Sequence, residues 1–103
     1  MFRIVEQNGL AMIKSFKHKG LKKFFLKNDS SGLEQHLVPR IQTRLTTIDA
    51  ADSIEGIDIP NYDLHQLKGD RKDIWSVKVS GNWRITFRFV DGDAEIVNLE
   101  DYH

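Results

Sequence analysis

Cysteine is absent from this chain of 103 residues. Its absence excludes disulfide bonds, thiolate catalysis and thiolate metal sites, and it fits a reducing cytoplasm. No apolar run approaches the roughly 18 residues that a membrane helix needs. The first residues also lack the basic, apolar and small-residue succession of a signal peptide. We therefore expect a cytoplasmic protein without a membrane partner.

Several motifs that would indicate a cofactor site or a catalytic nucleophile are also absent. There is no glycine-rich phosphate loop, which excludes nucleotide binding by a P-loop or a Rossmann unit. No serine lies in a nucleophile elbow, and the four histidines show no HExxH or other metal-ligand spacing. We expect no cofactor and no metal, although a metal site formed by His65, Asp101 and His103 stays open as a less favoured alternative.

Charge is balanced overall, with 15 basic and 15 acidic residues, but it is unevenly distributed. Met12–Lys27 carries six lysines and no acid, whereas Asp49–Asp63 carries five acids and no lysine or arginine. Two further basic clusters comprise Lys68, Arg71 and Lys72, and Arg84 with Arg88. Such patches can bind polyanions at zero net charge, although a lysine run is more often a solvated helix face.

The length suits one domain with a single core. Residues 1–11 look separable, because they contain the turn signal Asn8-Gly9 and Met12 could itself be a start. We therefore predict an N-terminal extension over residues 1–11, either non-native or the product of an alternative start, and one domain over residues 12–103.

Two helices are expected in the first half of the domain. After a short strand at Ile13–Phe16, an amphipathic helix is expected over Gly20–Lys27. A second helix is indicated by apolar residues spaced four, four and three apart, namely Leu37, Ile41, Leu45 and Ile48. Pro39 fits only in a first turn, so this helix should begin near residues 35–38. The acidic segment Asp49–Pro60 is expected to be a loop.

The second half reads as β-structure. Strands are expected over 62–67, 74–79, 83–90 and 94–99, and Asp91-Gly92 is a two-residue hairpin signal. In Trp83–Val90 the aromatic and apolar residues alternate with Arg84, Thr86 and Arg88. The predicted fold is α+β, with two N-terminal helices packed on one face of a small, mostly antiparallel sheet. The other face is expected to be open and to carry Arg84 and Arg88.

This arrangement brings polar residues from distant segments together. An antiparallel hairpin places the start of the strand that holds Arg84 opposite the end of its partner. Asp101, Tyr102 and His103 emerge at that end, and His65 and Lys68 lie at the end of an earlier strand. Two imidazoles, two cations, a carboxylate and a phenol could thus converge at one sheet edge.

Such a set suits cleavage of RNA. A base takes the proton from a ribose 2′-OH, which attacks the adjacent phosphate, while an acid protonates the departing 5′-oxygen. Cations stabilise the added charge on the phosphate, and an aromatic ring can stack on a base. Taken singly, each residue also has an ordinary structural explanation, such as an ion pair or a place in the core.

Four segments together carry a resemblance: Phe16-Lys-His-Lys-Gly-Leu21, Leu64-His-Gln-Leu-Lys-Gly-Asp-Arg71, Asn82-Trp-Arg-Ile-Thr-Phe87 and Glu100-Asp-Tyr-His103. From Met12 to His103 the sequence resembles the HigB toxins of the RelE/ParE superfamily. The resemblance implies a small RelE-like α+β fold and a ribosome-dependent endonuclease that cuts mRNA in the ribosomal A site. It also implies a HigA-type antitoxin as partner, with operator DNA bound only through the antitoxin complex.

Carried over by position, the catalytic residues of the family fall on His65, Asp101, Tyr102 and His103. Lys68 and Arg84 correspond to its phosphate-facing cations, and the neighbouring Arg71 and Arg88 are further candidates for RNA binding. The neutral net charge departs from these toxins, which are often basic. Two alternatives stay open: a non-catalytic ParE-like toxin that binds DNA gyrase, and an inactive module that binds only an antitoxin and operator DNA.

Overall fold

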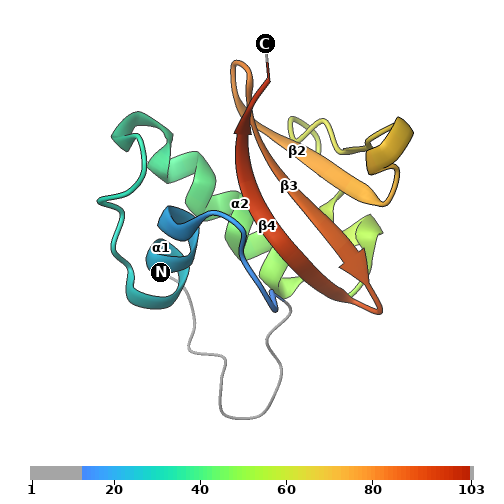
Figure 1. Cartoon of the computed structure of the whole chain (residues 1–103), viewed down its shortest axis with the longest axis horizontal. Helices are drawn as coiled ribbons and strands as arrows, with labels where there is room; N and C mark the ends of the chain where they lie inside the picture. The colour runs from blue at the N-terminus through green and yellow to red at the C-terminus, as the bar shows by residue number, and fades with distance from the viewer. Residues whose placement is uncertain (1–12, 103) are drawn as a thin grey trace.

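The computed structural model describes residues 13–102 (Figure 1). The predicted extension, residues 1–11, and the candidate residue His103 therefore lie outside the described part. Two α-helices precede four strands: α1 (Lys19–Lys27), α2 (Val38–Ala50), β1 (His65–Gln66), β2 (Ile74–Ser80), β3 (Trp83–Val90) and β4 (Asp93–Asp101). Three short 3₁₀ helices connect them, namely η1 (Gln35–Leu37), η2 (Ile54–Ile57) and η3 (Gly69–Arg71).

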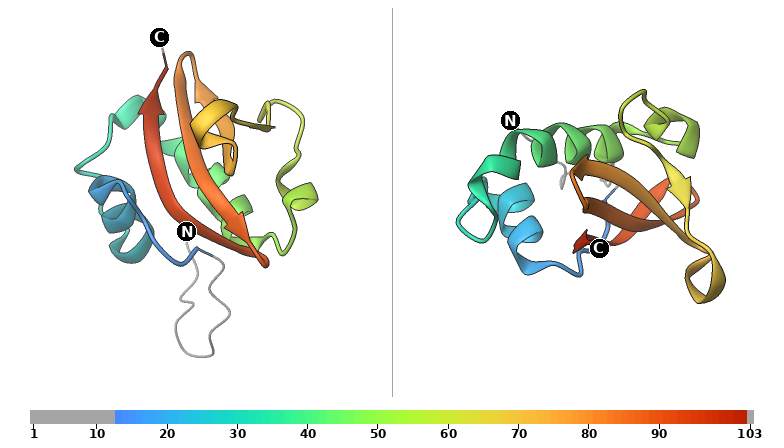
Figure 2. Two further views of the ribbon diagram at one scale, coloured as in Figure 1. Left: turned by 45° about the vertical axis from the view of Figure 1, so that its right-hand side comes forward. Right: turned by 90° about the horizontal axis from the view of Figure 1, so that it is seen from above.

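The strands form one antiparallel sheet in the order β1-β2-β3-β4. α2 lies on one side of this sheet, whereas η3 lies on the other (Figure 2). The predicted α+β architecture is confirmed. None of the helices in residues 13–102 is long and apolar enough to span a membrane.

The core lies between the helices and one face of the sheet. The predicted helical stripe of Leu37, Ile41, Leu45 and Ile48 is fully buried. It packs in the same cluster as Val77, Ile85, Phe87 and Val97 of the strands. As predicted, α2 begins directly after residues 35–37, with Pro39 in its first turn. Burial of these apolar side chains is the main favourable term for folding.

α1 has distinct signals at both ends. The ring Nδ1 of His18 accepts a hydrogen bond from the backbone N–H of Leu21 at 3.1 Å, so a histidine acts as the N-cap. Asn28 ends the helix in the left-handed conformation, with φ of 57°. Near the start, Gly20 lies against Gly32, and a Cβ on Gly20 would come within 2.7 Å of the Gly32 carbonyl oxygen.

Two expectations for the middle of the chain are wrong in detail. The segment Asp49–Pro60 is not a plain loop, because α2 extends to Ala50 and η2 buries Ile57 completely. The strand expected over residues 62–67 is reduced to β1. Asn61 and Asp63 adopt φ of 80° and 48°, and such left-handed residues interrupt an extended backbone.

The β3–β4 hairpin turns at Asp91-Gly92, as predicted, with positive φ at both residues. β4 contains a bulge, because the register changes between the pairs Arg88↔Glu95 and Thr86↔Asn98. Ile96 lies at this bulge with φ of 47°.

The chain before α1 pairs with β4 at this bulge. It forms only isolated parallel bridges, at Ile13 and Phe16, instead of the predicted strand. Ser15 accepts from the backbone N–H of Ile96 through its hydroxyl at 2.8 Å and from that of Val97 through its carbonyl at 3.1 Å. The first described residues therefore belong to the folded domain.

Candidate active site

The sheet face remote from the helices carries a buried polar layer. Ser76, Arg84 and Thr86 are all buried, and the side chain of Arg84 is only 10% exposed. The expectation of an open face is therefore wrong at these positions, because Asp63 and His65 cover Arg84 and Arg71 reaches across the sheet from η3. Every buried side-chain nitrogen and oxygen in the described residues has a hydrogen-bond partner.

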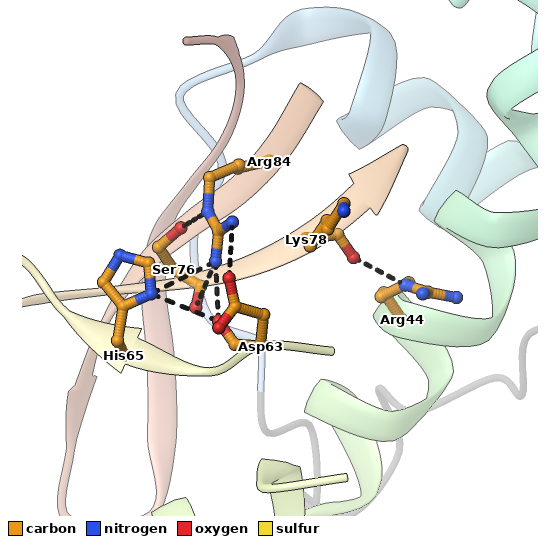
Figure 3. A network of polar contacts seen from close by, with 6 residues as sticks. All are labelled: Arg44, Asp63, His65, Ser76, Lys78 and Arg84. Atoms are coloured by element: carbon orange, nitrogen blue, oxygen red, sulfur yellow. Dashed lines mark hydrogen bonds and ion pairs between the residues drawn. The ribbon is translucent and has the colours of Figure 1, made fainter. Parts of the chain in front are cut away.

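Arg84 organises one half of this layer (Figure 3). Its Nε donates to the hydroxyl of Ser76, which lies on the neighbouring strand β2. One terminal nitrogen donates to the backbone carbonyl of Asp63 at 2.6 Å, and the other lies 3.3 Å from the Asp63 carboxylate. The left-handed backbone of Asp63 allows both of its oxygens to reach the same guanidinium. The charge of Arg84 is thus engaged by the protein itself.

His65 is held at one ring nitrogen by the same network. Its Nδ1 lies 3.2 Å from the Asp63 carbonyl oxygen and 3.3 Å from Arg84. The other ring nitrogen points away from the network (Figure 3), and the residue is exposed. If Nδ1 donates to the Asp63 carbonyl, Nε2 is the unprotonated base; if Nδ1 accepts from Arg84, Nε2 carries a proton. Either state presents Nε2 for proton transfer.

Arg71 organises the other half of the layer. Its guanidinium donates to both carboxylate oxygens of Glu100, at 3.0 and 2.6 Å, and lies 3.4 Å from the hydroxyl of Tyr102. The hydroxyl of Thr86 also donates to Glu100, at 2.5 Å. The hydrogen bond from Arg71 is the largest effect that lowers the pKa of Glu100, and it raises the pKa of Arg71 in turn. The phenol of Tyr102 is thus placed beside a fixed cation.

The predicted meeting of Arg84 with the end of the chain is confirmed. Arg84 pairs with Glu100 across β3 and β4, and Trp83 pairs with Asp101. The backbone N–H of Tyr102 donates to the carbonyl of Asn82 at 2.8 Å. Strand alternation places Tyr102 on the face of Glu100 and Arg84, and Asp101 on the opposite face.

The two remaining candidate cations, Lys68 and Arg88, differ in whether an acidic side chain pairs with them. Lys68 is exposed directly before η3 and makes no hydrogen bond or ion pair with the described part of the chain. Arg88 lies four residues beyond Arg84, about 13 Å along the strand. It pairs with Glu95 at 3.2 Å and Asp73 at 3.5 Å. Arg88 therefore belongs to a different set of ion pairs from Arg84 and Arg71.

Sequence reasoning missed three residues of this layer: Asp63, Ser76 and Glu100. Asp63 looked like one more acid of an acidic segment, and Ser76 like a polar residue of an amphipathic strand. Glu100 could have been found, because the pairing that brought Arg84 to the end of the chain also sets Glu100 opposite Arg84. No group of three potential metal ligands occurs within residues 13–102.

The sequence of this chain is similar to those of known toxins. The sequence profile of the family described as "RelE-like toxin of type II toxin-antitoxin system HigB" matches residues 14–103. A relative from Proteus vulgaris, named "Endoribonuclease HigB", is 55% identical over 92 residues, which are 89% of this chain and 100% of the relative. This chain therefore belongs to the HigB family of RelE-like toxins from type II toxin–antitoxin systems.

Proposed function

We propose that this protein is an endoribonuclease toxin that cleaves mRNA on the ribosome and is neutralised by a HigA-type antitoxin. The 55% identity to an endoribonuclease over nearly the whole chain supports the activity. The observation that carries the mechanism is the fixed position of His65 beside Arg84, whose strand β3 also pairs with the end of β4 that leads to Tyr102.

The reaction needs two proton transfers. One group takes the proton of a ribose 2′-OH, whose oxygen attacks the adjacent phosphorus, and another protonates the 5′-oxygen as the P–O bond breaks. His65 offers its Nε2 for one transfer, and His103 is proposed for the other, with Asp101 supporting it. Each transfer can contribute about 10²–10⁴ in rate. The products are a 2′,3′-cyclic phosphate and a 5′-hydroxyl.

The cations take different parts in this proposal. Lys68 is exposed and unpaired by the described residues, so it is suited to hold the attacked phosphate. Arg71 places the phenol of Tyr102 while its own charge is shared with Glu100, and the ring of Tyr102 can stack on a base. Arg84 is a positioning residue for His65, because its fork is occupied by Asp63 and Ser76.

The exposure of the site supports ribosome dependence. His65, Lys68 and Asp101 are all exposed, so these residues alone offer little to orient a flexible RNA strand at the cleaved bond. Positioning of reactants can supply about 7–11 kcal/mol of a barrier, and we propose that the ribosome supplies this positioning. The place of action is then the cytoplasm, and operator DNA is bound only through the complex with the antitoxin.

The test is to incubate one mRNA with the purified protein, with and without ribosomes, and to map the 5′ ends. We expect cuts within translated codons, 5′-hydroxyl ends, and no comparable cleavage without ribosomes. Equal cleavage in both reactions would disprove ribosome dependence but leave the nuclease intact. Growth arrest with inhibited gyrase and uncut mRNA would favour the ParE-like alternative instead.

A further inference from the structure

Two arginines of α2 differ from the arginines on the sheet and on η3. Arg71, Arg84 and Arg88 each pair with a carboxylate. Arg40 and Arg44 have no carboxylate partner within the described residues. Arg40 donates to the hydroxyl of Ser80 at 3.1 Å, and Arg44 donates to the backbone carbonyl of Lys78 at 2.9 Å. These contacts fix the guanidinium groups, and neither acceptor carries a negative charge.

Both arginines line an open cleft of about 800 Å³ between α2 and the end of β2. Lys78 is a third lining cation, and the guanidinium of Arg44 lies 4.3 Å over the ring of Tyr62. The one acid among the lining residues is Asp63, whose carboxylate is already bound to Arg84. The cleft thus gathers three cations, two of them held in place, and no unengaged acid is among its lining residues.

Burial is the largest effect on the pKa of Arg44 and lowers it; the neighbouring Tyr62 raises it, and the charge of Arg40 lowers it. An anion in the cleft would relieve the repulsion between the two guanidinium groups. A guanidinium fork also matches the geometry of a phosphate group.

The cleft adjoins the candidate active site. Asp63 lines the cleft and also contacts Arg84 and His65. Lys78 pairs directly with Arg84 across β2 and β3, and Figure 3 shows Arg44 and Lys78 beside the network of His65. An RNA strand that is cut at His65 would therefore pass close to this cleft.

We propose that the cleft lined by Arg40, Arg44 and Lys78 binds the phosphate backbone of the substrate RNA strand beside the cleaved bond. This inference rests on the proposed nuclease function. It assigns a second contact region for the RNA, which shares Asp63 with the His65 network. Because phosphate contacts position a strand without reading its bases, the cleft adds affinity and register but no codon preference.

The test compares two variants that each lose two positive charges. The cleft variant is Arg40→Gln with Lys78→Gln, and the control is Lys22→Gln with Lys27→Gln, at exposed positions of α1. Arg44 is left intact, because its stacking on Tyr62 gives it a structural role as well. Melting temperatures of both variants should stay close to that of the parent, since these side chains are exposed.

The first measurement is binding of a fluorescent single-stranded RNA with 2′-O-methyl groups, which cannot be cleaved by 2′-OH attack. For the cleft variant, the slope of log affinity against log salt should fall by about 0.7 for each lost phosphate contact. The control should change less. Equal changes in both variants, or no binding by the parent, would overturn the proposal. The measurement needs no catalysis, so failure of the nuclease function alone would not mimic this result.

The second measurement identifies the RNA. Affinity is compared for ribosomes with 2′-O-methyl mRNA in the A site and for ribosomes whose mRNA ends before it. The cleft variant should lose roughly tenfold on the first and little on the second, as expected when contacts to phosphates are removed. Equal loss on both would assign the cleft to ribosomal RNA. Loss of antitoxin binding alone would assign it to the antitoxin. Either result would overturn the proposal.

Discussion

Among single residues, Arg84 shows how burial changes the meaning of a cation. On sequence alone it is a surface charge on an amphipathic strand, suited to meet phosphate directly. In the structure it is buried and binds Ser76, Asp63 and His65. A buried guanidinium of this kind holds other groups in place, because leaving its partners unpaired is costly.

We therefore expect Arg84→Ala to lose stability as well as activity. Removal of the guanidinium leaves the buried hydroxyl of Ser76 without its donor, which costs about 1–3 kcal/mol. Thermal melting and single-turnover cleavage should both be measured. Ser76→Ala is the matched control, since it removes one acceptor and should retain more of both properties. An Arg84→Ala variant that melts at the same temperature as the parent would contradict this role. It would indicate that Arg84 is a surface charge available to phosphate.

The terminal imidazole allows a cleaner separation of chemistry from folding. Deletion of His103 should change stability by no more than about 0.5 kcal/mol, as for a surface residue. Cleavage should fall by about 10²–10⁴ if the imidazole transfers a proton. His103→Gln is the comparison, because it keeps the chain length and loses only the titration. Full toxicity of the deletion variant would leave proton transfer to His65 and Asp101.

The sequence predicted which residues meet but not how they are held. Antiparallel pairing through Asp91-Gly92 is sufficient to bring Arg84 to the end of the chain. The role of Asp63 depends on its φ of 48°, which neither its residue type nor the alternation of its neighbours indicates. Local backbone geometry, rather than composition, decides that half of the site.

Among the elements, α1 depends on a neutral histidine at its start. Burial lowers the pKa of His18 below the usual 6.5, so the folded state favours the neutral ring that accepts from Leu21. This stabilisation is complete above about pH 6.5 and is lost as the pH falls through the lower pKa of the folded state.

Urea unfolding at several values between pH 5 and 8 should show this loss. His18→Asn keeps a capping acceptor without the titration, so its free energy of unfolding should depend less on pH. His18→Ala should be less stable than the parent at pH 8 by about 1 kcal/mol. Identical pH profiles for the parent and His18→Asn would exclude the histidine cap as the source.

In the same helix, we expect replacement of Gly20 by alanine to lower the stability of the protein. An exposed helical glycine usually gains about 1 kcal/mol on replacement by alanine. Gly20→Ala should instead lower the melting temperature, because the new Cβ would lie 2.7 Å from the Gly32 carbonyl oxygen, and overpacking costs about 1–3 kcal/mol. Lys22→Ala on the exposed face is the control. A Gly20→Ala variant more stable than the parent would mean that the loop at Gly32 yields easily.

Elements with a long apolar period were predictable, and the short strand was not. The stripe on α2 was recognised because four apolar residues repeat at helical spacing and all are buried. β1 was overestimated because alternation at Tyr62 and Leu64 resembles a strand. The left-handed residues Asn61 and Asp63, one on each side of Tyr62, let these side chains reach the core without a ladder of hydrogen bonds.

For the whole molecule, residues 1–11 are predicted to be dispensable. The folded domain already uses Ile13, which is buried and bridges to Ala94 of β4. A chain that starts at Met12 should therefore match the full chain in melting temperature and in mRNA cleavage on ribosomes. An insoluble or inactive short form would place the first residues within the domain.

The bulge in β4 determines which face of the sheet each later residue of the chain occupies. In a regular hairpin from the same turn, Glu100 would stand opposite Trp83, and Leu99 would enter the polar layer. Tyr102 would then point away from Arg71, since a shift of one residue exchanges the two faces. The extra residue at Ile96 also makes β4 one residue longer than a regular pairing with β3 requires. Deletion of one residue between Gly92 and Ile96 can be absorbed by straightening the bulge, which would leave the register of the active end unchanged.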